Sequence, residues 1–295
     1  TETDLPRRAI HIHNITRGPD GKIYSSGYVV GNLGVFDPAT GTHRQIDAVK
    51  QAEGITAWGS RLCFGTYPRA RVIVFDTARP VGRENPSQIF TLEQEGQDRP
   101  FGMLAVPEHN RLFVGTVPGY GLLGGVLAEY DPGTGDVTIH RDVVPGQSIV
   151  TFACRDGILF GGTTIYGGLG VEPTQKEGKL FLWDVKKREK VFETVPVAGK
   201  RVVSALRIGP DGNLWGWAEG TLFIFDPDER RVIYSEEKLT TDALPHHFWR
   251  GGSMSEPVND GSFFGMLFGN LYRLDGVNRE LEVLARGSGS GAPDS

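Results

Sequence analysis

The sequence is poor in cysteine, and this scarcity removes one class of protein at once. Only two cysteines, Cys63 and Cys154, stand among its 295 residues. Each lies inside an apolar, strand-like run, "RLCFG" and "TFACRDG", so we expect buried thiols rather than a disulfide. Two cysteines exclude a disulfide-rich scaffold, and they leave the redox compartment of the protein open.

Long apolar runs and an excess of positive charge are missing as well. No run approaches the roughly 18 apolar residues of a membrane-spanning helix, so we expect no membrane partner. Lysine and arginine number 31 against 36 acidic residues, which gives a net charge of −5. This balance argues against a nucleic-acid-binding surface, since such surfaces depend on clustered basic residues.

Glycine and proline, in contrast, are abundant, at 41 and 18 residues. Few stretches run long without one of these turn-forming residues, which disfavours long helices. Hydrophobic residues make up 39% of the chain, enough for a sizeable core. The composition therefore favours a fold of short strands joined by many turns.

An apolar strand that ends in Asp and a turn recurs along the chain, as in "LGVFDPATG" and "LFIFDPDER". An Asp at the end of a strand indicates a turn, because its carboxylate accepts hydrogen bonds from backbone N–H groups two residues later. The repeats are separated by about 40 to 55 residues. The repeat aspartates are Asp37, Asp76, Asp131, Asp184, Asp226 and Asp275.

A second strand precedes each of these repeats, often behind an Asp-Gly pair, as in "DGKIYSSG" and "DGNLWGW". Asp-Gly before an apolar strand is a hairpin signal. Each unit then holds four antiparallel strands, which is the blade of a β-propeller. We predict an all-β propeller of four-stranded antiparallel blades, with six blades. Seven blades, or a fragment of a longer propeller, are the alternatives.

The motifs "GPDGKIY" and "GPDGNLW", with the Asp-turn strands, resemble those of the broad propeller group that includes YVTN, NHL, WD-repeat and gluconolactonase-like proteins. The resemblance covers about residues 10–284, although the signatures of true WD repeats are absent. It implies an architecture rather than one activity. We assign residues 1–9 to an N-terminal extension and 10–286 to a single propeller domain. Residues 287–295 have the composition of a flexible linker, and an engineered scar is one interpretation of them.

Two insertions break the regular spacing of the repeats. The connection from the second strand to the repeat Asp is 10 residues in three blades, but 16 in blade three and 22 in blade four. The extra residues are "VPGYGLLGG" (117–125) and "TTIYGGLGVEPTQKEG" (163–178). In a propeller these connections share a face with the loops between blades, so we predict that the insertions wall one pocket. Long loops on a rigid scaffold often carry function.

Polar residues at the starts of the innermost strands should meet at the mouth of the central channel, on that same face. Arginine there suits a carboxylate, because its planar fork matches carboxylate geometry. A structural pair, for example Arg99 with Asp98 or Glu53, is the alternative. The residues predicted to move a proton are Tyr67, Tyr166, His13 and His247. The residues predicted to bind the ligand are Arg69, Arg71, Arg99, Tyr120, Gln147, Glu172, Arg201, Trp249 and Arg250.

These residue types point to an acidic, uronate-containing glycan as the ligand. Several propeller families are polysaccharide lyases, so the resemblance implies β-elimination as a reaction. A non-catalytic propeller that binds a ligand or a protein is the alternative. We expect a small-molecule or oligosaccharide partner, a monomer and no cofactor. A divalent metal held by His13, Glu53 and His247 stays open, although no dense metal motif supports it.

Overall fold

The computed structural model describes residues 11–29, 31–240, 248–249 and 251–287. Six antiparallel sheets follow one another along the chain. Blade one comprises β1 (Ile12–Arg17), β2 (Ile23–Gly27), β3 (Leu33–Asp37) and β4 (Thr42–Ile46). Blade two comprises β5 (Ala52–Trp58), β6 (Arg61–Thr66), β7 (Arg71–Asp76) and β8 (Ser87–Thr91). Blade three comprises β9 (Gln97–Val106), β10 (Arg111–Pro118), β11 (Leu127–Tyr130) and β12 (Val137–His140).

The second half of the chain continues the pattern. Blade four comprises β13 (Ser148–Arg155), β14 (Ile158–Thr164), β15 (Leu180–Asp184) and β16 (Glu189–Thr194). Blade five comprises β17 (Val203–Ile208), β18 (Leu214–Ala218), β19 (Thr221–Asp226) and β20 (Arg231–Glu237). Blade six comprises β21 (Phe263–Leu267), β22 (Asn270–Leu274) and β23 (Leu281–Ala285).

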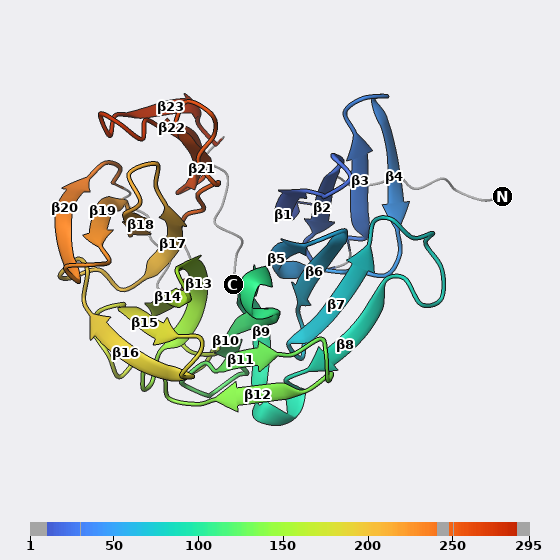
Figure 1. Ribbon diagram of the computed structural model, residues 1–295, viewed down its shortest axis with the longest axis horizontal. Coiled ribbons are helices and arrows are strands. Elements are labelled where there is room, and N and C mark those ends of the chain that lie inside the picture. Colours follow the sequence, from blue (N-terminus) through green and yellow to red (C-terminus); the bar gives the residue numbers. More distant parts are fainter. Residues whose placement is uncertain (1–10, 30, 241–247, 250, 288–295) are drawn as a thin grey trace.

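Blade six takes its innermost strand from an irregular segment. Ser253 N donates to Met266 O at 2.8 Å, and Ser255 N donates to Phe264 O at 2.7 Å. This segment therefore lies along β21 in the place that a fourth strand occupies in the other blades. Figure 1 shows the six sheets arranged around a common axis. The predicted all-β propeller of six four-stranded blades is confirmed.

Helix is almost absent from the described residues. Two single turns of 3₁₀-helix, η1 (Glu93–Glu95) and η2 (Pro107–His109), flank β9. No helix in the described part of the chain is long and apolar enough to cross a membrane.

The repeat aspartates form the predicted turns. In each blade the Asp Oδ1 accepts a hydrogen bond from the backbone N–H two residues later, as between Asp37 and Ala39 at 3.0 Å and between Asp131 and Gly133 at 2.8 Å. The same contact recurs at the other four aspartates. Backbone hydrogen bonds also hold the pKa of Asp226 below its usual value of 3.8. Local turn chemistry therefore closes the hairpin between the third and fourth strands of every blade.

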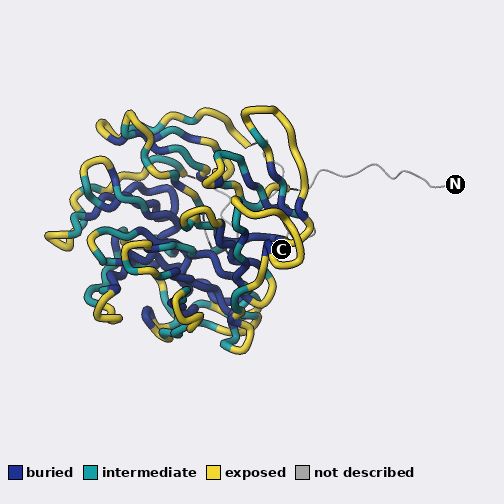
Figure 2. Tube along the Cα trace, turned by 45° about the vertical axis from the view of Figure 1, so that its right-hand side comes forward, coloured by how far each residue is buried: buried dark blue, intermediate teal, exposed yellow. Residues whose placement is uncertain are grey.

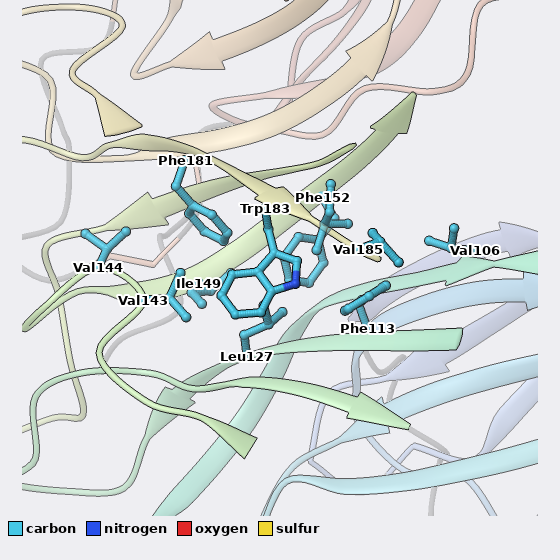
Figure 3. Close-up of a cluster of buried hydrophobic side chains, with 11 residues drawn as sticks. Val106, Phe113, Leu127, Val143, Val144, Ile149, Phe152, Phe181, Trp183 and Val185 are labelled. Carbon is cyan, nitrogen blue, oxygen red and sulfur yellow. The ribbon is translucent and has the colours of Figure 1, made fainter. Parts of the chain in front are cut away.

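The core lies between the blades, because both faces of the middle strands pack on neighbours. Figure 2 shows buried residues concentrated along these inner strands and exposed residues at the hairpins and outer strands. Figure 3 shows the interface of blades three and four, where Trp183 packs among Phe113, Leu127 and Val185. Middle strands buried on both faces are apolar almost throughout, as β19 is.

Two repeat positions build every interface between successive blades. The residue four before the repeat Asp of one blade packs with the residue just before the repeat Asp of the next blade. We call them the front position and the back position. The front and back pairs are Leu33 with Phe75, Val72 with Tyr130, Leu127 with Trp183, Leu180 with Phe225, and Leu222 with Leu274.

Candidate functional site

The two insertions lie against each other through their backbones. Gly121 N donates to Leu169 O at 2.8 Å, and Gly168 N donates to Leu122 O at 2.9 Å. A Cβ atom at Gly168 would lie 1.8 Å from the carbonyl oxygen of Gly119. This close approach requires glycine. The glycine run of blade four thus lets the two insertions form one joined wall.

A fully buried carboxylate lies at the start of the innermost strand of blade two. Glu53 Oε2 lies 2.5 Å from His13 Nε2, and Glu53 Oε1 accepts from Arg99 Nη1 at 2.8 Å. Gln51 Nε2 donates to the same Oε1 at 3.0 Å. A buried carboxylate is costly unless it is paired and hydrogen-bonded, and here three polar side chains contact it. Strands of blades one, two and three thus meet at Glu53, which we take as the centre of the channel mouth.

Aromatic rings fix the Arg99 guanidinium in place. Its Cζ lies 3.9 Å from the ring centroid of Tyr67 and 4.7 Å from that of Trp249. Trp249 Nε1 donates to Gly167 O at 2.7 Å, which connects this cluster to the blade-four insertion. Burial raises the pKa of Tyr67, against the opposing effect of Arg99, so its hydroxyl is protonated at neutral pH.

A second arginine is paired with a buried glutamate, and the two sites meet where Tyr166 packs in one apolar cluster with Phe101 and Trp249. Arg201 Nε donates to Glu219 Oε1 at 3.0 Å, and its Nη2 donates to Oε2 at 3.2 Å. Its Nη1 donates to the hydroxyl of Tyr166 at 3.0 Å. Tyr166 is buried, and burial raises the pKa of its hydroxyl. Arg201 thus joins the blade-four insertion to blade five.

The other residues predicted to bind a ligand differ in burial and in their partners. Arg69 is exposed, with its Nε 3.3 Å from Glu93 Oε1. Arg71 is half-buried, and its Nε has no hydrogen-bond partner in the described part of the chain. Tyr120 is 64% exposed on the blade-three insertion, and its side chain is hydrogen-bonded to that of Tyr67, so this insertion also reaches the cluster.

Gln147 is fully buried, and its side chain is bonded to Thr163 and to the backbone carbonyl of Glu177. It therefore holds the base of the insertion. Glu172 is exposed on the blade-four insertion. His247 and Arg250 lie outside the described residues.

No cluster of three or more metal-ligating side chains occurs among the described residues. A hollow of about 210 Å³ lies at the other end of the innermost strands and is bordered by Phe152, Cys154, Arg207 and Glu256. Arg207 Nε lies 2.9 Å from Glu256 Oε1 there. Burial raises the pKa of Cys154 to about 12, so its thiol is protonated and a poor nucleophile.

Sequence reasoning missed Glu219, the partner of Arg201. Glu219 follows the buried strand β18 and has a φ of 43°. The available signal was an acidic residue directly after the apolar run "LWGWA" and before Gly220. Glu53, in contrast, was foreseen as a structural partner of Arg99, and the structure contains that pair.

No family model matches the chain, and no curated protein is similar to it in sequence. Solved structures do resemble it. Streptogramin B lyase matches with a TM-score of 0.68 and 11% identity over 94% of this chain and 84% of that one. U3-55K matches with a TM-score of 0.69 and 10% identity over 95% and 83%.

A third match comes from B. thetaiotaomicron. The extracellular domain of the putative hybrid two component system BT3049 has a TM-score of 0.62 and 13% identity over 95% of this chain. The chain spans 36% of that structure's length. At these identities the comparisons show a β-propeller fold, and the YVTN and NHL subgroup is not confirmed.

Proposed function

We propose that the channel mouth binds an acidic, uronate-containing sugar, and that His13 acts on it as the base of a β-elimination. The observation that carries the proposal is the Glu53 cluster. One buried carboxylate there orients a histidine on one side and an arginine on the other. Aromatic faces and the joined insertions border the same place.

The arginine supplies the recognition of charge. A guanidinium has five N–H donors, and the bond to Glu53 uses one nitrogen, Nη1. Contacts with the rings of Tyr67 and Trp249 hold the guanidinium in place. A carboxylate could then bind along its edge through two parallel hydrogen bonds. The tyrosine and tryptophan rings also suit the apolar C–H faces of a sugar.

The histidine supplies the proton transfer. In the tautomer that carries its proton on Nε2, where Glu53 accepts it, the lone pair that takes the substrate proton is on Nδ1 of His13. In β-elimination the base removes the proton beside the sugar carboxylate, and the freed electron pair forms a C=C bond. The bond to the glycosidic oxygen breaks, and this oxygen takes up a proton. Tyr67, whose hydroxyl stays protonated, suits that donor role.

The alternative is a binding propeller without catalysis. The pair of Arg201 and Glu219 favours this alternative. Arg201 already donates hydrogen bonds to Glu219 and to the Tyr166 hydroxyl. Much of the charge at the mouth is thus neutralised within the protein. Streptogramin B lyase is named as a lyase, but at 11% identity this likeness extends to the fold alone.

Calorimetry and ultraviolet absorbance together test the proposal. Wild-type protein should bind uronate oligosaccharides more tightly than neutral ones and release an unsaturated, ultraviolet-absorbing product. His13→Asn should abolish the product while leaving affinity within a few-fold of wild type. Equal affinity for charged and neutral sugars would refute the acidic-sugar site. Selective binding without any product would leave the non-catalytic function in its place.

A further inference from the structure

The first and last blades each carry an interface position that is exposed, whereas the same position in the other blades is buried or half-buried. At the front position, Leu33, Val72, Leu127, Leu180 and Leu222 are each 0% exposed. Leu271, the front residue of blade six, is 39% exposed. At the back position, Phe75 and Phe225 are buried, whereas Phe36 of blade one is 44% exposed. The front position of blade six and the back position of blade one are therefore exposed, unlike the buried positions named above.

Other apolar side chains extend both exposed faces. Met266 pairs across from Leu271 and is 44% exposed, and Leu284 on β23 is 44% exposed. On blade one, Ile23 pairs across from Phe36. Ile23 pairs in turn with Arg17 of β1. Ile15 lies two residues before Arg17, so its side chain is on the same face of the sheet, and it is 58% exposed. Each face therefore has the apolar character of an interface between blades rather than of an outer surface.

The arrangement of the ring leaves these two faces opposite each other. The innermost strands β1, β5, β9, β13 and β17 each contact the next in the series. Among the described residues, no strand of blade six pairs with a strand of blade one. Figure 1 shows blades one and six separated more widely than any two consecutive blades.

We infer that this opening is a docking site for one further four-stranded β-sheet, inserted between blade six and blade one. Its back position would pack on Leu271, and its front position would pack on Phe36, which repeats the contact found at the five other interfaces. The unit would span about 40 to 55 residues, by the spacing of the repeats.

The comparisons agree with an occupant of this size. Nearly all of this chain is matched in both comparisons, 94% with streptogramin B lyase and 95% with U3-55K. The part of the other structure that is left unmatched is 16% of streptogramin B lyase and 17% of U3-55K. That share of each structure corresponds to about one repeat of this chain. A second copy of the chain is a poorer occupant, because its other interface faces are already filled by its own blades.

Adding a blade to the chain tests the inference. Residues 195–237, which comprise blade five and the connection before it, would be fused after Ala285. The fused unit should raise the Tm by about 5 °C or more, since it buries two apolar faces. It should also slow maleimide labelling of a Phe36→Cys variant at least tenfold. Burial raises the pKa of both native thiols to about 12, so they label slowly.

A matched control carries Leu222→Asp and Phe225→Asp in the fused copy alone, which places charge at both interface positions. This control should leave the Tm and the labelling rate near those of the unfused chain. Equal behaviour of the two fusions would overturn the inference. So would a disulfide between Phe36→Cys and Leu271→Cys in the unfused chain. If it forms within one molecule, blades one and six close on each other; if between two, a second copy is the occupant.

Discussion

Two buried glutamates in this protein hold nearly the same partners in different surroundings. Glu53 and Glu129 are 0% and 2% exposed, and each pairs with a histidine and at least one arginine. Arg111 Nε lies 2.8 Å from Glu129 Oε1, and Arg188 Nη2 lies 3.0 Å from it. Arg111 lies on β10 and Arg188 in a hairpin of blade four, so Glu129 fastens two neighbouring blades together.

The histidine beside each glutamate lies in different surroundings. His140 beside Glu129 packs on Trp183, with 4.6 Å between their ring centroids, inside the interface of blades three and four. His13 beside Glu53 lies at the channel mouth, where the rings of Tyr67 and Trp249 contact Arg99 and Trp249 is bonded to the blade-four insertion. The same set of side chains can therefore be structural or functional, and its place in the propeller separates the two roles.

The largest expected effect is a loss of stability when the buried glutamate is removed, and we expect it both for Glu53 with its partners and for Glu129 with its partners. Glu53→Ala and Glu129→Ala each leave partly buried arginines without their carboxylate, so each should lower the free energy of unfolding by at most about 3–5 kcal/mol. Urea denaturation followed by tryptophan fluorescence measures this. A loss below 1 kcal/mol at either site would show that water readily replaces the carboxylate there.

Ligand binding should separate the two clusters. A charge-assisted hydrogen bond contributes about 1.5–3 kcal/mol, so Arg99→Ala should weaken binding of uronate oligosaccharides by about one to two orders of magnitude. Arg99→Lys should recover part of the loss, because lysine keeps the charge but not the fork. Arg111→Ala is the matched control, since it removes an arginine from the other cluster.

Calorimetry of these three variants, each checked for an intact fold, is the measurement. The distinction between the two clusters fails if Arg111→Ala weakens binding as much as Arg99→Ala does.

A smaller effect concerns pH. Burial alone would raise the pKa of Glu129, but hydrogen bonds from His140 and the two arginines outweigh it and hold this pKa below 4.5. A depressed carboxyl pKa adds stability above the unfolded value, near pH 4.5, and this contribution is lost as the pH falls through the folded value. Glu129→Gln should therefore differ most from wild type at pH 7, and the difference should shrink below pH 4.5. Denaturation midpoints from pH 3 to 7 check this; a constant difference would contradict it.

The sequence predicts the blades well because each blade depends on local chemistry. The turn at Asp37 needs only the two residues that follow it. Strand register then places Glu53 and Arg99 together, since both start innermost strands of adjacent blades.

Other contacts depend on loop paths that no periodicity encodes. Trp249, which contacts Arg99, belongs to the connection between blades five and six and to no repeat motif. Likewise, Gln147 was predicted to bind a ligand, but its side chain is buried and accepts a hydrogen bond from Thr163 within the blade. Residues at strand starts could be placed from the sequence, whereas residues in connections could not.

The smallest expected effect is at Arg69, and it sharpens the boundary of the site. Arg69 and its partner Glu93 have side chains 64% and 51% exposed, with 3.3 Å between the charged atoms. Exposed pairs of this kind contribute about 0–1 kcal/mol, because water screens the charges and both side chains lose freedom. Arg69→Ala should therefore change the free energy of unfolding by less than about 1 kcal/mol. Affinity for the acidic sugar should change less than threefold, since the Glu53 cluster is intact. Should Arg69→Ala weaken binding as strongly as Arg99→Ala, the site would extend from the channel mouth onto the exposed loop of blade two.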